Sequence, residues 1–448
     1  MMIKINLIKK LILHSAFSGK LVYNKQFTKT GSQYLIEKNI RGLENIDFPY
    51  VVPKKWTFAY LGDLVKIYTG KKDANFADLN GNFPFFTCAN KPTTCNSYSY
   101  DGEYLLMPGN GASIGLVFYY HGKFEAYQRT YLLENIKDIN LKYLKYHIEY
   151  NWLEFNHNKM HGAATPFIKI ANLLYFPIGL PSLEEQEAIV SKLDEIFAEL
   201  DKIDEKQTRL ATIQEKMETK ILKLAIQGKL VEQRPEEGTG EELFKLIQQE
   251  KQELIKQGKI KKEKPLPVIE EDEIPFEIPS TWKWVRLSQI TYNHGQKTPN
   301  NRFSYIDIGS IDNINHCLNR NENIIEQGNA PSRARKIVCE GDIVYSTVRP
   351  YLHNIAIIDK KFSEEPIAST GFAILSCTSG VVNKYVFWCL LSSYFDCYAN
   401  MDGNAKGVMY PAISDDKLSK GLIPLPPLEE QNRIVAKIEE LLPLCRRN

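Results

Sequence analysis

The longest regular pattern of apolar positions in the chain begins at Leu183. Steps of four and three residues join its members, which are Ile189, Leu193, Ile196, Leu200, Ile203, Leu210, Met217, Ile221 and Leu224. Such steps place one apolar stripe along a helix. Ser182, followed three residues later by Glu185, forms a capping box at its start. The pattern therefore predicts a continuous helix of about 45 residues, roughly 65 Å long.

This stripe has the spacing of a coiled-coil seam, with Gln207 and Gln214 as two polar interruptions. A seam of this length needs a partner helix. Both ends of the chain carry matching patterns, at Ile5, Ile8 and Ile12 and at Ile434, Ile438 and Leu441. We expect the two ends to meet and to form a second, interrupted helix antiparallel to the central one, related to it by an approximate two-fold axis. The alternative is two surface helices that never meet.

Several segments of the chain occur twice. LPSLEEQEAIVSKLDEIF, from Leu180, matches LPPLEEQNRIVAKIEELL, from Leu425, at 10 of 18 positions. ILHSAFSGKLV, from Ile12, matches ILKLAIQGKLV, from Ile221, at 7 of 11. P-x-x-W recurs at 53–56 and 279–282, and Gly162, Pro166, Ile168 and Leu173 recur as Gly407, Pro411, Ile413 and Leu418. The chain is thus two long units with the same order of motifs.

The repeat predicts an α+β fold, in which two globular α/β target recognition domains are separated by two long antiparallel coiled-coil helices. The expected segments are an N-terminal helical segment at 1–47, a first domain at 48–181, a central helix and linker at 182–270, a second domain at 271–426 and a C-terminal helix start at 427–448. The domain interiors share little sequence beyond their edges. This indicates one scaffold that carries two domains with different binding specificities. An old duplication without division of function is the alternative.

Charge and cysteine content narrow the class of protein. Lysine and arginine number 56 and aspartate and glutamate 54, so no basic tail points to nucleic acid. The 8 cysteines are scattered and form no C-x-x-C pair, which is typical of a reducing cytosol. Polar residues interrupt the N-terminal apolar pattern, and no apolar stretch approaches the length of a membrane span. We therefore expect a cytoplasmic protein without a membrane partner.

Sequence motifs of catalysis are missing. The chain has no G-x-x-x-x-G-K-[ST] loop, no G-x-G-x-x-G and no G-x-S-x-G. His157 and His161 have the spacing of a zinc-protease pair, but no glutamate follows His157. The tetrapeptides expected of an amino-methyltransferase are absent as well. We therefore predict no catalytic, cofactor-binding or metal-binding residue, and a chain that binds and positions something else.

Polar glycine loops supply the candidate DNA contacts. Lysine and arginine neutralise phosphates, while asparagine and arginine can read base edges with two hydrogen bonds. In the first domain the candidates are Lys71, Lys72, Asn90, Lys91, Asn110 and Arg129. In the second they are Lys297, Asn300, Arg302, Ser346, Arg349 and Lys406. Each of them could instead be ordinary solvated surface. Two recognition domains held apart by a long rigid helix suggest a DNA site in two parts, with half-sites about 34 Å apart.

The doubled P-x-L-E-E-Q helix starts, the GKLV helix ends, the P-x-x-W entries and CEGDIVYSTVRP resemble the specificity subunits of type I restriction-modification systems. The resemblance covers essentially the whole chain. It implies a non-catalytic subunit that recognises a bipartite site in double-stranded DNA. It also implies that the long helices dock two methyltransferase subunits, whose S-adenosylmethionine serves adenine methylation, and that two restriction subunits supply ATP- and Mg-dependent chemistry. The helix length then sets the spacer between half-sites.

Two other readings stay open. One is the specificity subunit of a related restriction system that lacks a separate motor subunit. The other is a coiled-coil adaptor whose globular parts bind proteins and not DNA. The sequence does not indicate which bases are read, or which domain reads which half-site.

Overall fold

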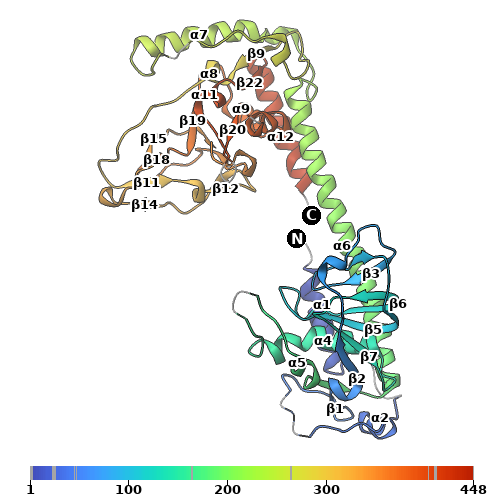
Figure 1. Cartoon of the computed structure of the whole chain (residues 1–448). Coiled ribbons are helices and arrows are strands. Elements are labelled where there is room, and N and C mark those ends of the chain that lie inside the picture. Colours follow the sequence, from blue (N-terminus) through green and yellow to red (C-terminus); the bar gives the residue numbers. More distant parts are fainter. Residues whose placement is uncertain are drawn as a thin grey trace. The chain divides into compact units, whose positions relative to one another are not determined.

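A computed structural model describes residues 4–22, 27–44, 46, 48–162, 165–262, 265–401, 403–407 and 411–446, apart from the side chains of Lys406 and Arg446 (Figure 1). The chain forms two compact units, Met1–Thr208 and Arg209–Asn448. Among the described residues, no helix combines the length and the hydrophobicity that crossing a membrane requires.

The first unit is built on one mixed sheet. Its helices are α1 (Ile5–Phe17), α2 (Gly31–Glu37), α3 (Leu61–Leu64), α4 (Leu141–Asn156), α5 (Ile170–Leu174), the first part of α6 (Leu183–Ile226) and the short 3-10 turn η1 (Ala74–Phe76). Its strands are β1 (Thr57–Tyr60), β2 (Val65–Thr69), β3 (Phe83–Phe86), β4 (Thr93–Cys95), β5 (Tyr100–Pro108), β6 (Phe118–Ala126), β7 (Thr130–Asn135) and β8 (Pro177–Leu180). Six strands pair in the order β2-β7-β5-β6-β3-β4, while β1 pairs with β8.

The second unit contains the end of α6 and two larger sheets. Its helices are α7 (Gly240–Lys256), α8 (Leu287–Ile290), α9 (Asn383–Leu390), α10 (Ser393–Asn400), α11 (Asp415–Ser419) and α12 (Leu428–Arg446), with 3-10 turns at η2 (Pro235–Glu237), η3 (Glu271–Glu273), η4 (Ile308–Ser310), η5 (Gln327–Asn329) and η6 (Pro350–Leu352). Its strands are β9 (Lys283–Arg286), β10 (Thr291–Tyr292), β11 (Phe303–Ile306), β12 (Ile311–Asp312), β13 (Cys317–Leu318), β14 (Ile324–Ile325), β15 (Ala334–Ile337), β16 (Ile343–Ser346), β17 (Ile355–Ile357), β18 (Glu365–Ser369), β19 (Phe372–Cys377), β20 (Ala405–Lys406), β21 (Ala412–Ile413) and β22 (Leu422–Leu425).

The sequence repeat corresponds to a repeat of contacts at the P-x-x-W and LEEQ motifs. The indole of Trp56 donates to the carboxylate of Glu185 at 3.0 Å, and the indole of Trp282 donates to that of Glu430 at 2.9 Å. All four side chains are buried. Each pair joins the entry of a globular region to the first turn of the helix that follows it, α6 or α12. A buried donor and acceptor must both be paired, so neither motif can change alone.

The glutamine and a tyrosine of each unit repeat in the same way. The side-chain oxygen of Gln186 accepts from the backbone N–H that precedes α4, and that of Gln431 accepts from the N–H that precedes α9. The hydroxyls of Tyr143 in α4 and Tyr385 in α9 donate to the carbonyls of Gly179 and Pro424, in the strand before each LEEQ helix. We call these contacts, together with the Trp–Glu pairs, the frame contacts.

The GKLV motifs end helices with a left-handed glycine. Gly19 and Gly228 have φ values of +68° and +67°. A Cβ atom at Gly19 would lie 2.1 Å from Cγ of Pro53, and one at Gly228 would lie 2.4 Å from Cγ of Pro279. A glycine therefore satisfies both the backbone conformation and the close approach of the P-x-x-W proline.

The interiors of the two units are more alike than their sequences. The order β2-β7-β5-β6 of the first unit recurs as β10-β19-β16-β17 in the second. The interiors share little sequence, yet they share this strand order. The units differ in the strands that are added to these four. A hairpin of β3 and β4 extends the first sheet, whereas β14-β11-β18-β15 form a separate sheet in the second.

The long central helix is confirmed, and α6 runs without a break from Leu183 to Ile226 (Figure 1). Its first apolar residues, Ile189 and Leu193, belong to the core of the first unit. In its middle, Leu210 and Met217 are 48% and 49% exposed. Within the first unit α1 lies against α6, where Lys9 forms an ion pair with Asp201 at 2.5 Å. The joining of α1 and α12 into a second rod concerns both units and stays a prediction.

Candidate nucleic-acid interface

A repeated backbone contact positions the candidate loop of the first unit, which follows β5. The amide of Gly111 donates to the carbonyl of Pro166 at 2.8 Å, and the amide of Ile168 donates to the carbonyl of Gly109 at 2.9 Å. Asn110 lies between these two bonds and is half-buried. The repeated segment that contains Pro166 and Ile168 thus holds this loop in place.

The loop after β16 has the same attachment in the second unit. The amide of Arg349 donates to the carbonyl of Pro411 at 2.7 Å, and the amide of Ile413 donates to the carbonyl of Thr347 at 2.9 Å. Pro411 and Ile413 are the repeat partners of Pro166 and Ile168. Arg349 has a φ of +50°, an uncommon conformation for a residue with a side chain. The structure therefore puts Asn110 and Arg349 on equivalent loops.

Asn110 and Arg129 line one cavity of about 400 Å³ in the first unit, together with Gln128 and Phe167. The amide of Gly109 donates to the carbonyl of Arg129 at 2.9 Å, which joins the loop after β5 to the turn between β6 and β7. The Arg129 side chain is exposed, and Phe167 is 40% exposed. An amide, a guanidinium and an aromatic ring at one open cavity are groups that hydrogen-bond to or stack on bases.

Lys71 and Lys72 lie beside this turn, after β2. The carbonyl of Lys72 accepts from the amide of Gln128 at 2.8 Å, and its ammonium lies 4.5 Å from the centre of the Phe76 ring. Lys71 is exposed. The preceding Gly70 fits because a Cβ atom there would lie 2.2 Å from the carbonyl oxygen of Ala126. The two lysines therefore sit on a backbone turn that is fixed to the same end of the sheet.

Asn90 and Lys91 come from the hairpin loop between β3 and β4, and both are exposed. The hydroxyl of Ser113 donates to the side-chain oxygen of Asn90 at 2.5 Å. Ser113 belongs to the loop after β5, so this bond connects the hairpin to the loop of Asn110. All six candidates of the first unit thus lie on linked loops, which we call the first loop surface (70–73, 87–92, 109–117 and 127–129).

The candidates of the second unit are less open. The ammonium of Lys297 is paired with the carboxylate of Glu365 at 2.5 Å. The guanidinium of Arg302 lies 3.5 Å from Glu364, with 51% of its side chain exposed. Asn300, between them in sequence, is exposed. A carboxylate beside each cation reduces the positive charge that these loops offer to a phosphate.

Ser346 and Lys406 differ from the other candidates. Ser346 is 2% exposed, and its hydroxyl donates to the carbonyl of Val348 at 2.9 Å. It therefore stabilises the loop that carries Arg349 and does not face solvent. The backbone of Lys406 pairs with Ala412 in the β20–β21 hairpin, and its side chain lies outside the described residues.

Two sets of residues near these loops were not singled out from the sequence. Gln128 lines the cavity of the first unit, and its amide nitrogen donates to Asp73 at 2.7 Å. In the second unit, Arg333 and Thr370 are exposed and are joined by a backbone hydrogen bond of 2.8 Å. The segment AYQRT already contained Gln128, but no sequence signal distinguished Arg333, because its partner segment lies far along the chain.

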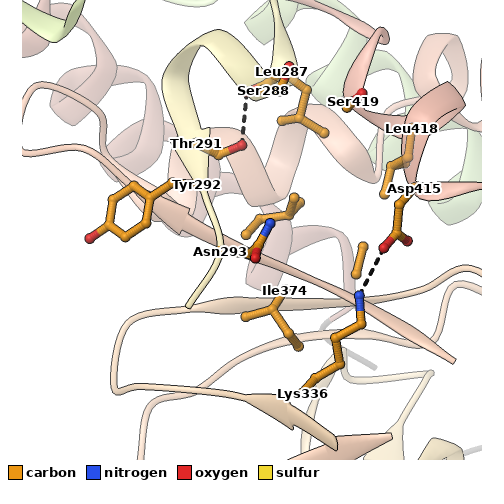
Figure 2. Close-up of a pocket in the computed structure, with 12 residues that line it drawn as sticks. Leu287, Ser288, Thr291, Tyr292, Asn293, Lys336, Ile374, Asp415, Leu418 and Ser419 are labelled. Atoms are coloured by element: carbon orange, nitrogen blue, oxygen red, sulfur yellow. Dashed lines mark hydrogen bonds and ion pairs between the residues drawn. The ribbon is translucent and has the colours of Figure 1, made fainter. Parts of the chain in front are cut away.

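A separate, smaller pocket lies between α8, α11 and the strands β15 and β19 (Figure 2). Its volume is about 80 Å³, which is enough for a few water molecules. Lys336 and Asp415 face each other there and form an ion pair at 2.8 Å. The size and this internal pairing fit a solvated gap between elements better than a site for an organic ligand.

These features define a class of protein. It has two sheet domains with the same strand order, and each domain carries polar loops at the same end of its sheet. Comparison with known protein families agrees. Residues 53–214 and 279–444 each match the family described as type I restriction modification DNA specificity domain. These segments make up well over half of the chain, and the chain belongs to this family.

Several individual proteins are similar to this chain. The chain is 29% identical to the type I restriction enzyme EcoDI specificity subunit of Escherichia coli, over 87% of this chain and 82% of the relative. It is 30% identical to the EcoAI specificity subunit of the same species, over 69% and 61%. A solved HsdS subunit from Thermoanaerobacter tengcongensis is 35% identical over 38% of this chain and 45% of that one, with a TM-score of 0.35.

Proposed function

We propose that this chain is the DNA sequence-specificity subunit of a type I restriction-modification complex. The observation that carries the proposal is the presence of two copies of a DNA specificity domain in one chain. The two domains, at 48–181 and 271–426, would each read one half of a bipartite site in double-stranded DNA. The chain itself would perform no catalysis, and it would act in the cytoplasm.

In the first domain, the first loop surface supplies the contacts. Asn110 and Arg129 share one cavity and would read base edges, since asparagine pairs with adenine and arginine with guanine through two hydrogen bonds. Lys71, Lys72 and Lys91, with Asn90 beside them, would contact the phosphate backbone. Phosphate contacts fix the register of the domain on the duplex, and base contacts provide the specificity.

In the second domain we assign base reading to the loop of Arg349, because its backbone attachment equals that of the Asn110 loop. Asn300, Arg302 and Lys297 lie on the segment between β10 and β11, and Lys406 precedes the repeated Gly407. These four would contact phosphates or groove edges. Ser346 is not included, since its hydroxyl is buried and already bonded.

The long helices would carry the partners. The exposed apolar residues Leu210 and Met217 in the middle of α6 fit a seam that another helix covers. We propose that α1 and α12 complete that second helix and that the rod docks two methyltransferase subunits. These would bring S-adenosylmethionine, and two restriction subunits would bring ATP and Mg.

Methylome sequencing of the host with and without this gene tests the function. We expect loss of adenine methylation at one bipartite motif when the gene is removed, and that motif gives both half-sites and the spacer together. Binding of the chain with its methyltransferase subunits to random duplex DNA provides the matched experiment in vitro. An unchanged methylome together with binding that shows no sequence preference would instead support an adaptor.

The helix α6 also predicts the spacer. Deleting one heptad, Leu210–Lys216, shortens the helix by two turns, about 10 Å. We expect the tolerated spacer to change while both half-site sequences stay the same, as read by methylation of a library of spacer lengths. A change in the half-sites themselves would contradict this role of the helix.

A further inference from the structure

Three metal-binding side chains meet in the second unit, at the edge of its first sheet. They are His294, just after β10, and Cys339 and Asp342, in the turn that leads into β16. One ligand atom of each lies within 4.8 Å of the other two. This cluster was not predictable from the sequence, because the histidine is distant from the C-x-x-D turn and no C-x-x-C motif is present.

Hydrogen bonds already fix the buried part of the cluster. Asp342 has a side chain that is 4% exposed, and one of its oxygens lies 3.4 Å from Nε2 of His294. The other oxygen accepts from the hydroxyl of Ser376 at 2.6 Å, and this hydroxyl lies 3.0 Å from the same Nε2. The backbone amide of Cys339 donates to Asp342 at 2.7 Å. The carboxylate, the imidazole and the base of the thiol side chain are thus held together.

The donor set selects a class of ion, and the one short distance between two of the donors is consistent with it. Ligand atoms about 2.0 to 2.3 Å from a tetrahedral zinc ion are separated from one another by roughly 3.3 to 3.8 Å. The 3.4 Å between His294 and Asp342 falls in this range. Mg²⁺ and Ca²⁺ prefer oxygen ligands only, while thiolate and imidazole favour zinc-type ions. The exposed position of Cys339 leaves the outer side open.

We propose that His294, Cys339 and Asp342 bind one zinc-type divalent cation, with water as the fourth ligand. His294 would bind through Nε2 and keep its proton on Nδ1, while the Cys339 thiol would release its proton to solvent. Ser376 would orient the carboxylate as a partner outside the coordination sphere. The ion would join β10, the turn before β16 and β19, which are adjacent elements of the second recognition domain, and would stabilise that domain.

The test uses the full chain, treated with a chelator and then titrated with Zn²⁺ alone against a chromophoric competitor. We expect one tightly bound Zn²⁺ per chain in the wild type. Cys339→Ser and His294→Gln should each weaken binding at least about tenfold. Cys397→Ser alters another exposed cysteine and is the matched control, expected to bind as the wild type does.

Co²⁺ provides an independent readout, since a cobalt–thiolate bond gives an absorption band in the near ultraviolet. That band should be present in the wild type and in Cys397→Ser and absent in Cys339→Ser. Circular dichroism shows that each variant is folded, and Cys339 is the decisive position because its exposure makes a folding defect on replacement by serine small. A wild type that retains no Zn²⁺, or equal loss in Cys397→Ser and Cys339→Ser, would overturn the proposal.

Discussion

In the first recognition domain, β3 and β4 extend the main sheet, and all six candidate contacts lie on loops that hydrogen-bond to one another. In the second domain, the added strands form a sheet of their own, and Lys297 and Arg302 lie beside carboxylates. The frame contacts nevertheless agree within a few tenths of an ångström. Contacts between buried polar groups are repeated, whereas the strands added to the four shared ones differ between the domains.

One buried position separates the domains within the shared part. His147 of α4 accepts a hydrogen bond from the amide of Gly179 through Nε2, at 3.1 Å, one helical turn after Tyr143. One turn after the matching Tyr385, α9 has Cys389. Both residues are buried. Burial lowers the pKa of His147 to about 3 and raises that of Cys389 to about 12. Two neutral side chains of different size thus fill the same place, but only the histidine takes up a proton in mild acid when the chain unfolds.

The largest expected effect tests whether the repeated frame is equally strict in both domains. A Cβ atom at Gly31 would lie 2.1 Å from the carbonyl oxygen of Leu180, and one at Gly240 would lie 2.2 Å from that of Leu425. Gly31→Ala and Gly240→Ala should each lower the free energy of unfolding by about 3 kcal/mol, because backbone must move to make room. Urea unfolding measures this. Gly328→Ala is the control, because a Cβ atom there would have no atom within 4 Å. If only one of the two glycine variants lost much free energy of unfolding, the repeated contacts would not be equally important for stability in both domains.

The next largest effect is a loss of stability in mild acid, which we expect in the first domain alone because of His147. The folded state keeps His147 neutral down to about pH 3, while the unfolded chain takes up a proton below 6.5. Protonation therefore stabilises the unfolded state as pH falls. The free energy of unfolding decreases by about 1.4 kcal/mol for each pH unit below 6.5. At pH 5 the loss is about 2 kcal/mol.

Hydrogen exchange of α4 and α9 peptides, corrected for intrinsic rates, separates the two domains. We expect α4 protection to fall between pH 7 and pH 5 more steeply than α9 protection. His147→Gln should remove the difference in slope, since glutamine keeps an acceptor and does not titrate. Equal slopes for the two helices in the wild type would contradict the assignment.

A smaller effect concerns base reading. Arg129→Ala should weaken discrimination at one position of one half-site by about 1 to 2 kcal/mol and leave the other half-site unchanged. Methylation of a randomised target library by the assembled methyltransferase measures both half-sites at once. Arg41→Ala, at an exposed position far from the cavity in sequence, serves as the control. Changes in both half-sites would argue against one domain for each.

The smallest effect compares an open lysine with a paired one. Lys71→Ala should weaken binding to all DNA sequences and reduce the slope of log affinity against log salt by about one. Lys297→Ala should reduce DNA affinity and the salt slope less, because the carboxylate of Glu365 already partly neutralises the charge of Lys297. Competition binding over a salt series gives both slopes. A larger loss at Lys297 would mean that the pair opens on DNA.

Features with local causes were predictable from the sequence. The start of α6 at Leu183 follows from Ser182, whose hydroxyl accepts from the amide of Glu185 at 3.3 Å, and the ends of the GKLV helices follow from Gly19 and Gly228. The shared strand order was not predictable, because it depends on pairings between distant segments whose sequences have diverged. The polar character of YSTVRP suggested contacts at Ser346, but its hydroxyl is buried. Likewise, the pairing of Lys297 depends on Glu365, which no local pattern connects to it.

The frame contacts also bear on how such a chain can change. Each recognition domain meets its following helix through one indole, one tyrosine hydroxyl and one N-terminal helix amide, and their acceptors lie in or next to the LEEQ motif. A segment exchanged between the P-x-x-W and LEEQ motifs would bring its own donors to acceptors that are the same in both halves. Recombination at these motifs is thus expected to exchange one recognition domain while the frame contacts stay intact.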